Sequence, residues 1–120
     1  MKYTNESFTM YSDPGHGWLK VSLKAVRDCG LYMTQDFSAY SYYRHDAKGG
    51  HVYLEEDCDA GIFLAAYYNK YNAMPLIRHS NTKRDSKIRG YERLPYGSRF
   101  NINMQEGRAI WRAMREQSAA

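Results

Sequence analysis

A short loop near the N-terminus carries residue types that act as acids and bases. It reads Ser12-Asp13-Pro14-Gly15-His16-Gly17-Trp18. Asp13 and His16 could form an acid–base pair, since such chemistry needs a titratable group held beside the reacting atoms. The alternative is structural: the Asp13 side chain accepts hydrogen bonds from its own turn, and Trp18 packs in the core. The spacing alone defines no catalytic geometry, so we predict no catalytic residue and keep the loop as a region of interest.

A second candidate is a group of acids, Glu55-Glu56-Asp57 and Asp59. Clustered carboxylates can bind Mg²⁺ or Ca²⁺, or raise one another's pKa. No EF-hand loop follows them. They also precede a predicted helix, whose N-terminal dipole favours negative charge. Helix capping, with Asp57 as N-cap, therefore accounts for the acids, and we predict neither a metal site nor a cofactor.

The two cysteines of the chain, Cys29 and Cys58, are expected to be free thiols. Cys58 falls near a predicted helix N-terminus, where thiolates are favoured. The neighbouring carboxylates oppose this, and a Cys–His hydrolase needs a histidine within reach. A small buried side chain is the simpler interpretation of Cys58. The four His and two Cys show no zinc-ligand spacing.

Positive charge is concentrated in one stretch of a chain whose net charge is +4. Residues 75–100 hold seven Lys and Arg against two acids, whereas residues 1–74 have a net charge of −2. Basic side chains interleaved with aromatic rings can neutralise phosphates and stack on bases. A solvated basic face that balances the acids elsewhere is the alternative. The predicted binding residues are Arg78, Lys83, Arg84, Lys87, Arg89, Tyr91, Arg93 and Tyr42.

Tyrosine is unusually frequent, with 12 copies in 120 residues. Tyr67 and Tyr71 lie on the apolar stripe of a predicted helix and are expected in the core. Tyr42, Tyr43 and Tyr68 cannot all face inward. An exposed aromatic patch would indicate a partner, and ordinary half-buried tyrosines are the alternative.

These residues must be positioned by short strands and a few helices. We expect strands around Phe8–Met10 and Trp18–Val21, and a helix over Leu23–Cys29 between Ser22 as N-cap and Gly30. A hairpin over 39–55, a helix over 58–71, strands at 76–79 and 87–91, and a C-terminal helix follow. The predicted order is β-β-α-β-β-α-β-β-α. The predicted class is α+β, a small antiparallel sheet with two or three packed helices, as a single domain over 1–95 with a helical extension over 96–120.

Three strings occur together in this sequence: Ser12–Trp18, Val52-Tyr53-Leu54-Glu55-Glu56-Asp57-Cys58-Asp59-Ala60, and Ser86-Lys87-Ile88-Arg89-Gly90-Tyr91-Glu92. In this order they resemble a group of small proteins encoded by bacteriophages and related mobile elements. The resemblance covers about residues 7–93 and carries no catalytic residues or ligands with it. It implies an accessory role in the cytoplasm of an infected bacterium. The absence of a signal peptide and of a long apolar run agrees with a cytoplasmic location away from membranes.

Three functions remain open at this point. The first is a non-enzymatic binding protein that engages an anionic partner, nucleic acid or a nucleotide-like ligand, through the basic tyrosine-containing surface. The second is an inhibitor of a host protein, such as an antiviral defence factor. The third is a small hydrolase that uses Asp13, His16 or Cys58. The sequence does not decide whether the protein forms a homo-oligomer.

Overall fold

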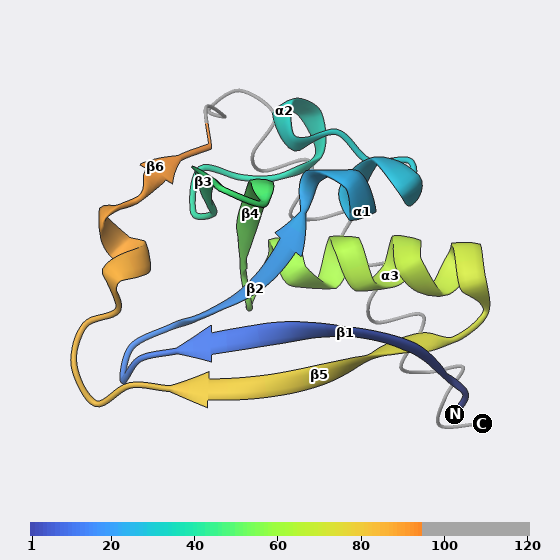
Figure 1. Cartoon of the computed structure of the whole chain (residues 1–120), viewed down its shortest axis with the longest axis horizontal. Helices are drawn as coiled ribbons and strands as arrows, with labels where there is room; N and C mark the ends of the chain where they lie inside the picture. Colours follow the sequence, from blue (N-terminus) through green and yellow to red (C-terminus); the bar gives the residue numbers. More distant parts are fainter. Residues whose placement is uncertain (95–120) are drawn as a thin grey trace.

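The computed structural model describes residues 1–94, which form a mixed six-stranded sheet and three α-helices. Along the chain the elements are β1 (Tyr3–Ser12), β2 (Gly17–Ser22), α1 (Leu23–Asp28), α2 (Met33–Asp36), β3 (Tyr42–Asp46), β4 (Gly49–Glu55), α3 (Asp59–Tyr71), β5 (Met74–Asn81), the 3₁₀-helix η1 (Lys87–Gly90) and β6 (Glu92–Arg93) (Figure 1). The predicted α+β class is confirmed. The helix predicted within 96–120 lies outside the described residues. No helix of the described part is long and apolar enough to cross a membrane.

The sheet has the strand order β5-β1-β2-β4-β3-β6. Neighbouring strands are antiparallel except β1 and β5, which are parallel, with Phe8 opposite Ile77. The prediction of an antiparallel sheet is therefore wrong at this pair. Helix α3 is the cause, because a helical connection carries the chain back along the sheet and allows β5 to run in the direction of β1.

The first helix begins at Leu23 after Ser22, as predicted, and ends at Asp28, one residue before the predicted end. The Ser22 hydroxyl accepts a hydrogen bond from the backbone N–H of Ala25 at 3.1 Å. Gly30 follows the helix with φ of +79°, a left-handed conformation that favours glycine. In β4, Val52 and Leu54 are fully buried on the face covered by the helices, which confirms the predicted alternation.

Helix α3 begins differently from the prediction. Its N-cap is Cys58, not Asp57. The next residue, Asp59, is fully buried and accepts hydrogen bonds from the backbone N–H of Ser38 at 3.0 Å and from the hydroxyls of Ser38 and Ser41. Burial raises the pKa of the Asp59 carboxyl. This carboxyl therefore ties the segment before β3 to the start of α3.

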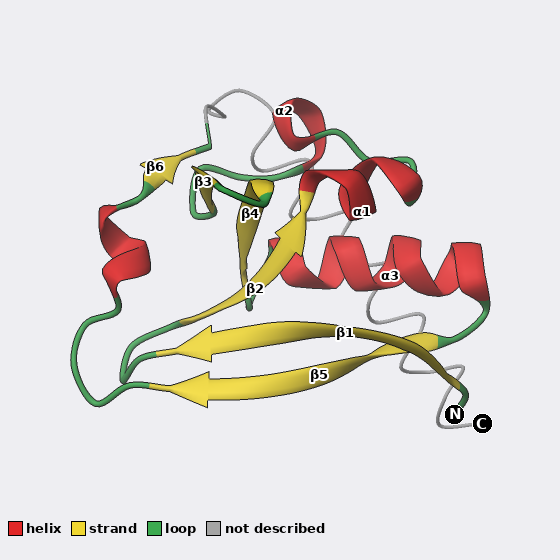
Figure 2. Cartoon of the chain, viewed as in Figure 1, coloured by secondary structure: helices red, strands yellow, loops and turns green. Residues whose placement is uncertain are grey.

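Two apolar clusters occupy the two faces of the sheet. The larger cluster lies between the sheet and the helices. The smaller one, on the opposite face, consists of Trp18, Tyr42, Tyr53 and Ile88. Figure 2 shows the chain after β5 passing on that side, through η1, to β6.

The strand predicted over 87–91 is wrong, because residues 87–90 form η1 and Tyr91 caps its end. The Ser86 hydroxyl caps the turn by accepting a hydrogen bond from the backbone N–H of Ile88 at 3.2 Å. The Ile88 side chain, 2% exposed, packs into the smaller cluster. The predicted element order is thus not the observed one, which also includes the short helix α2.

The tyrosines of α3 divide between core and surface. Tyr67 is 1% exposed, as predicted, whereas Tyr71 is 41% exposed, so its assignment to the core is wrong. The Tyr71 ring packs on Tyr67 at a centroid distance of 4.5 Å, and Lys70 Nζ lies 5.3 Å from the centroid of the Tyr71 ring.

Candidate functional site

Asp13 links the loop between β1 and β2 to η1. Its Oδ1 accepts hydrogen bonds from the backbone N–H groups of Gly15 and His16, both at 3.0 Å. Its Oδ2 accepts one from the backbone N–H of Ser86 at 2.9 Å. The Arg89 guanidinium adds two more, Nε to Oδ2 at 2.7 Å and Nη2 to Oδ1 at 2.9 Å. The structural alternative for Asp13 therefore holds: it organises the loop rather than facing a substrate.

This arrangement fixes both the charge of Asp13 and the position of Arg89. The guanidinium and the backbone donors hold the pKa of the Asp13 carboxyl well below its usual range. A Cβ at Gly15 would lie 2.9 Å from Nη2 of Arg89, so a larger residue there would displace the guanidinium from this position. The Arg89 guanidinium also lies over the buried ring of Trp18, with Cζ 5.3 Å from the ring centroid.

A second arginine, Arg93 of β6, stands beside the first. Its Cζ lies 5.7 Å from the centroid of the Tyr42 ring. Among residues 1–94 no carboxylate forms an ion pair with Arg93, whereas Arg89 is paired with Asp13. Within the described part of the chain, Arg93 is thus a cation of this region without an acidic partner.

The two arginines open onto a cleft of about 460 Å³. One part of the cleft is basic and aromatic, and its residues are His16, Trp18, Tyr40, Tyr42, Arg89 and Arg93. The other part carries acids and a thiol, from Glu55, Asp57 and Cys58. The volume falls in the range of about 300–1,000 Å³ that is usual for small-molecule sites. We refer to this feature as the cleft.

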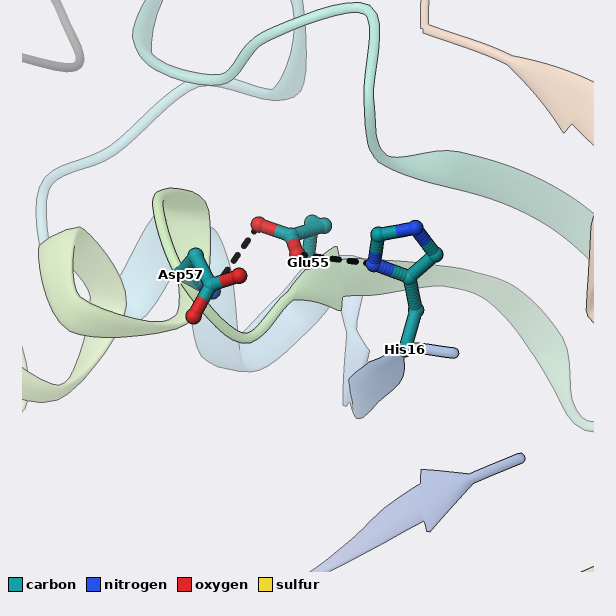
Figure 3. A group of neighbouring side chains, drawn as sticks. All are labelled: His16, Glu55 and Asp57. Atoms are coloured by element: carbon teal, nitrogen blue, oxygen red, sulfur yellow. Dashed lines mark hydrogen bonds and ion pairs between the residues drawn. The ribbon is translucent and has the colours of Figure 1, made fainter. Parts of the chain in front are cut away.

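The acidic part of the cleft is built at the end of β4. Trp18 pairs with Glu55 in the sheet, and this register brings the loop that carries His16 next to the Glu55 carboxyl. Glu55 Oε1 lies 3.7 Å from His16 Nδ1, and its Oε2 accepts a hydrogen bond from the backbone N–H of Asp57 at 2.8 Å (Figure 3). Burial raises the pKa of the Glu55 carboxyl.

Cys58 also lines the cleft, so the structure brings this thiol and His16 to one place. The thiol is buried and hydrogen-bonds to Glu55. The carboxyl that lies next to His16 is thus also the partner of the thiol. Cys58 and Cys29 are both free cysteines.

The predicted binding residues divide into three groups. Tyr42, Arg89 and Arg93 meet in the cleft, together with His16 and Trp18 of the loop. Lys87 and Tyr91 line a neighbouring, smaller cleft of about 270 Å³ on the same sheet face. The remaining three are exposed and line neither cleft: Arg78, Lys83 and Arg84.

The smaller cleft adds cations that the sequence did not single out. The guanidinium of Arg44 lies over the Tyr91 ring, with Cζ 4.8 Å from the centroid, and Lys20 Nζ lies 5.9 Å from that of Tyr53. The rings are largely covered: Tyr53 is 5% exposed and Tyr42 6%. The Tyr42 and Tyr53 rings therefore offer little open surface for stacking bases.

The pairing of His16 with Glu55 and Asp57 was also missed from the sequence. The signal that points to it is the hairpin register, since Glu55 was expected on the face opposite Val52 and Leu54. Strand β2 had no predicted partner, so nothing placed the loop beside that face.

In comparisons with known proteins, no protein-family model, no curated protein and no solved structure matches the chain.

Proposed function

We propose that this protein is a non-enzymatic binding protein that takes a small nucleotide-like anion into the cleft. The observation that carries the proposal is the placing of Arg93, which has no acidic partner among the described residues, beside the aromatic rings of the same cleft. Arginine binds phosphate through paired N–H donors. Of the aromatic rings that line the cleft, Trp18 and Tyr42 are buried, so the exposed ring of Tyr40 is the one that can contact a base.

Pre-organisation supports the proposal. Arg89 is held by Asp13 and by the Trp18 ring, and Arg93 by β6 and the Tyr42 ring. A ligand that meets fixed side chains loses less free energy to ordering them. Tyr40 also lines the cleft and is 52% exposed.

The volume of the cleft and the burial of the nearby aromatic rings favour a small ligand over a nucleic-acid strand. The Tyr42 and Tyr53 rings are covered, and Arg78, Lys83 and Arg84 do not line the cleft. A strand would need these charges and open rings along one path.

A hydrolase remains the second candidate, because His16 and Cys58 line one cleft. The surroundings of Cys58 argue against a hydrolase. Its thiol is buried and hydrogen-bonded to the Glu55 carboxyl. A nucleophilic cysteine instead needs a neighbouring base or cation that stabilises the thiolate. The binding function is therefore the one that the geometry supports better.

The proposal is tested by isothermal titration calorimetry. The ligands are nucleoside mono-, di- and triphosphates and a short single-stranded RNA, each titrated once in EDTA and once in excess Mg²⁺. Arg93→Gln should weaken nucleotide binding at least about tenfold, because a hydrogen bond to a charged group contributes about 1.5–3 kcal/mol. Arg84→Gln, the matched control outside the cleft, should leave the affinity unchanged. The proposal fails if no nucleotide binds, if only the RNA binds, or if the two variants lose affinity equally. Turnover of the nucleotide that stops in Cys58→Ala would instead establish the hydrolase.

A further inference from the structure

The side chains of His16, Glu55 and Asp57 form a group whose chemistry the nucleotide proposal does not use. One nitrogen and two carboxylate oxygens converge from the β1–β2 loop, the end of β4 and the turn before α3 (Figure 3). We propose that these three residues bind one divalent metal ion of the Mn²⁺ or Zn²⁺ type.

The distances suit a single ion. The three donor atoms lie within 4.8 Å of one another, and His16 Nδ1 is 3.7 Å from Glu55 Oε1. Ligands about 2.1 Å from a metal lie about 3.0–3.4 Å apart in octahedral or tetrahedral geometry. His16 and Asp57 are exposed, so their side chains can close the remaining distance without moving the core.

The backbone around the three donors is held in place. The His16 N–H donates to Asp13 Oδ1, and its carbonyl accepts from the Asp13 N–H at 2.9 Å. The Asp57 N–H donates to Glu55 Oε2. The Glu56 N–H donates to the Gly17 carbonyl at 3.0 Å, which fastens the two loops together. The backbone from which the three donor side chains extend is thus fixed before an ion arrives, and only the exposed side chains of His16 and Asp57 need to adjust.

The donor types indicate the class of metal. Carboxylates alone suit Mg²⁺ and Ca²⁺, and an imidazole nitrogen shifts the preference towards first-row transition metals. Three protein ligands leave coordination positions for water or for an oxygen of another ligand. These positions face the cleft, because all three residues line it.

The ion would also resolve a conflict of charge in the cleft. A phosphate beside Arg93 would lie near the carboxylates of Glu55 and Asp57, which repel it. A divalent cation between them offsets that repulsion and can bind phosphate oxygens directly. This bridging role rests on the proposed nucleotide binding, whereas metal binding by the three side chains does not.

The test is titration of the full-length protein with Mn²⁺ and Mg²⁺ alone, followed by calorimetry and, for Mn²⁺, electron paramagnetic resonance. We expect one Mn²⁺ per chain, bound more tightly than Mg²⁺. His16→Asn and Asp57→Asn each alter an exposed side chain and should weaken Mn²⁺ binding at least about tenfold, because even outer-shell changes lower metal affinity 10- to 100-fold. His16→Asn should also reduce the preference for Mn²⁺ over Mg²⁺.

Glu56→Gln is the matched control, because Glu56 is an exposed acid of the same segment that does not belong to the group. Its Mn²⁺ affinity should equal that of the unchanged protein. The proposal is overturned if Mn²⁺ binding is not saturable, or if Glu56→Gln weakens it as much as Asp57→Asn. Saturable Mn²⁺ binding without any nucleotide binding upholds the metal site and rejects the nucleotide function. Nucleotide binding without any Mn²⁺ binding supports the nucleotide function and rejects the metal site.

Discussion

Tyr53 shows what burial does to one ionisable residue on the basic face. Its ring is 5% exposed beneath the η1 segment, and burial raises its pKa to about 12. An unfolded tyrosine loses its proton near pH 10. Folding therefore favours the neutral phenol, so this contribution to stability is fully present below pH 10 and is lost as the pH rises towards 12.

Tyr53→Phe should remove that alkaline loss. Between pH 10 and 12 the free energy of unfolding of the variant should fall less steeply than that of the unchanged protein. Urea denaturation across this range measures both slopes. Tyr32→Phe, at a site that is 58% exposed, serves as the control. Equal slopes in the unchanged protein and Tyr53→Phe would show that Tyr53 is not the group responsible.

Asp13 is the residue on which the loop geometry depends most. Its carboxylate accepts from three backbone N–H groups as well as from Arg89. In Asp13→Asn, the side-chain amide N–H₂ would face the N–H donors that now bind the carboxylate, so some of these hydrogen bonds would be lost. We expect the free energy of unfolding to fall by about 2 kcal/mol. Arg89→Gln should cost less, because the backbone donors remain satisfied. Chemical denaturation of both variants decides the order, and a larger loss in Arg89→Gln would assign the stability to the ion pair instead.

At the scale of elements, the sequence predicted what depends on neighbours in the chain. The helix after Ser22, the two faces of β4 and the amphipathic stripe of α3 through Tyr67 all follow from local spacing. Segment 87–91 was assigned as a strand because its alternation of polar and apolar residues also fits a strand. The choice of η1 depends on Ile88 meeting rings from β2, β3 and β4, contacts that are distant in sequence.

The candidate site was predictable only in its parts for the same reason. His16, Trp18, Arg89 and Arg93 were singled out by residue type. Their meeting with Glu55 requires the pairing of β2 with β4 and the bond from Arg89 to Asp13, which is 76 residues away in sequence. Local composition contains neither contact.

The η1 segment depends on Ile88 for its docking on the sheet. Ile88→Ala removes buried methyl groups and should lower the free energy of unfolding by about 2–4 kcal/mol, whereas Ile88→Val should cost about 1 kcal/mol. Because η1 carries Arg89, Ile88→Ala should also weaken nucleotide binding. Thermal unfolding together with calorimetry measures both effects. An unchanged nucleotide affinity in Ile88→Ala would show that ligand binding in the cleft does not depend on the packing of η1.

At the scale of the whole molecule, the six predicted basic binding residues are divided among several surfaces. Arg89 and Arg93 face the cleft, Lys87 lines the smaller cleft, and Arg78, Lys83 and Arg84 belong to neither. A small ligand in the cleft therefore meets few of these charges, whereas a nucleic-acid strand lying across the molecule would meet most of them. The dependence of affinity on salt distinguishes the two, because each neutralised phosphate contributes to the slope.

For a nucleotide in the cleft we expect a slope of log affinity against log salt of about −1 to −2, at constant metal concentration. A single strand that engaged all six of these cations would give a slope of about −4. The double variant Lys83→Gln with Arg84→Gln discriminates further, because it removes two charges without altering the cleft. Its nucleotide affinity and slope should equal those of the unchanged protein. A slope that becomes shallower by more than one in this variant would mean that the anion follows the outer basic residues, and the ligand would then be a nucleic-acid strand.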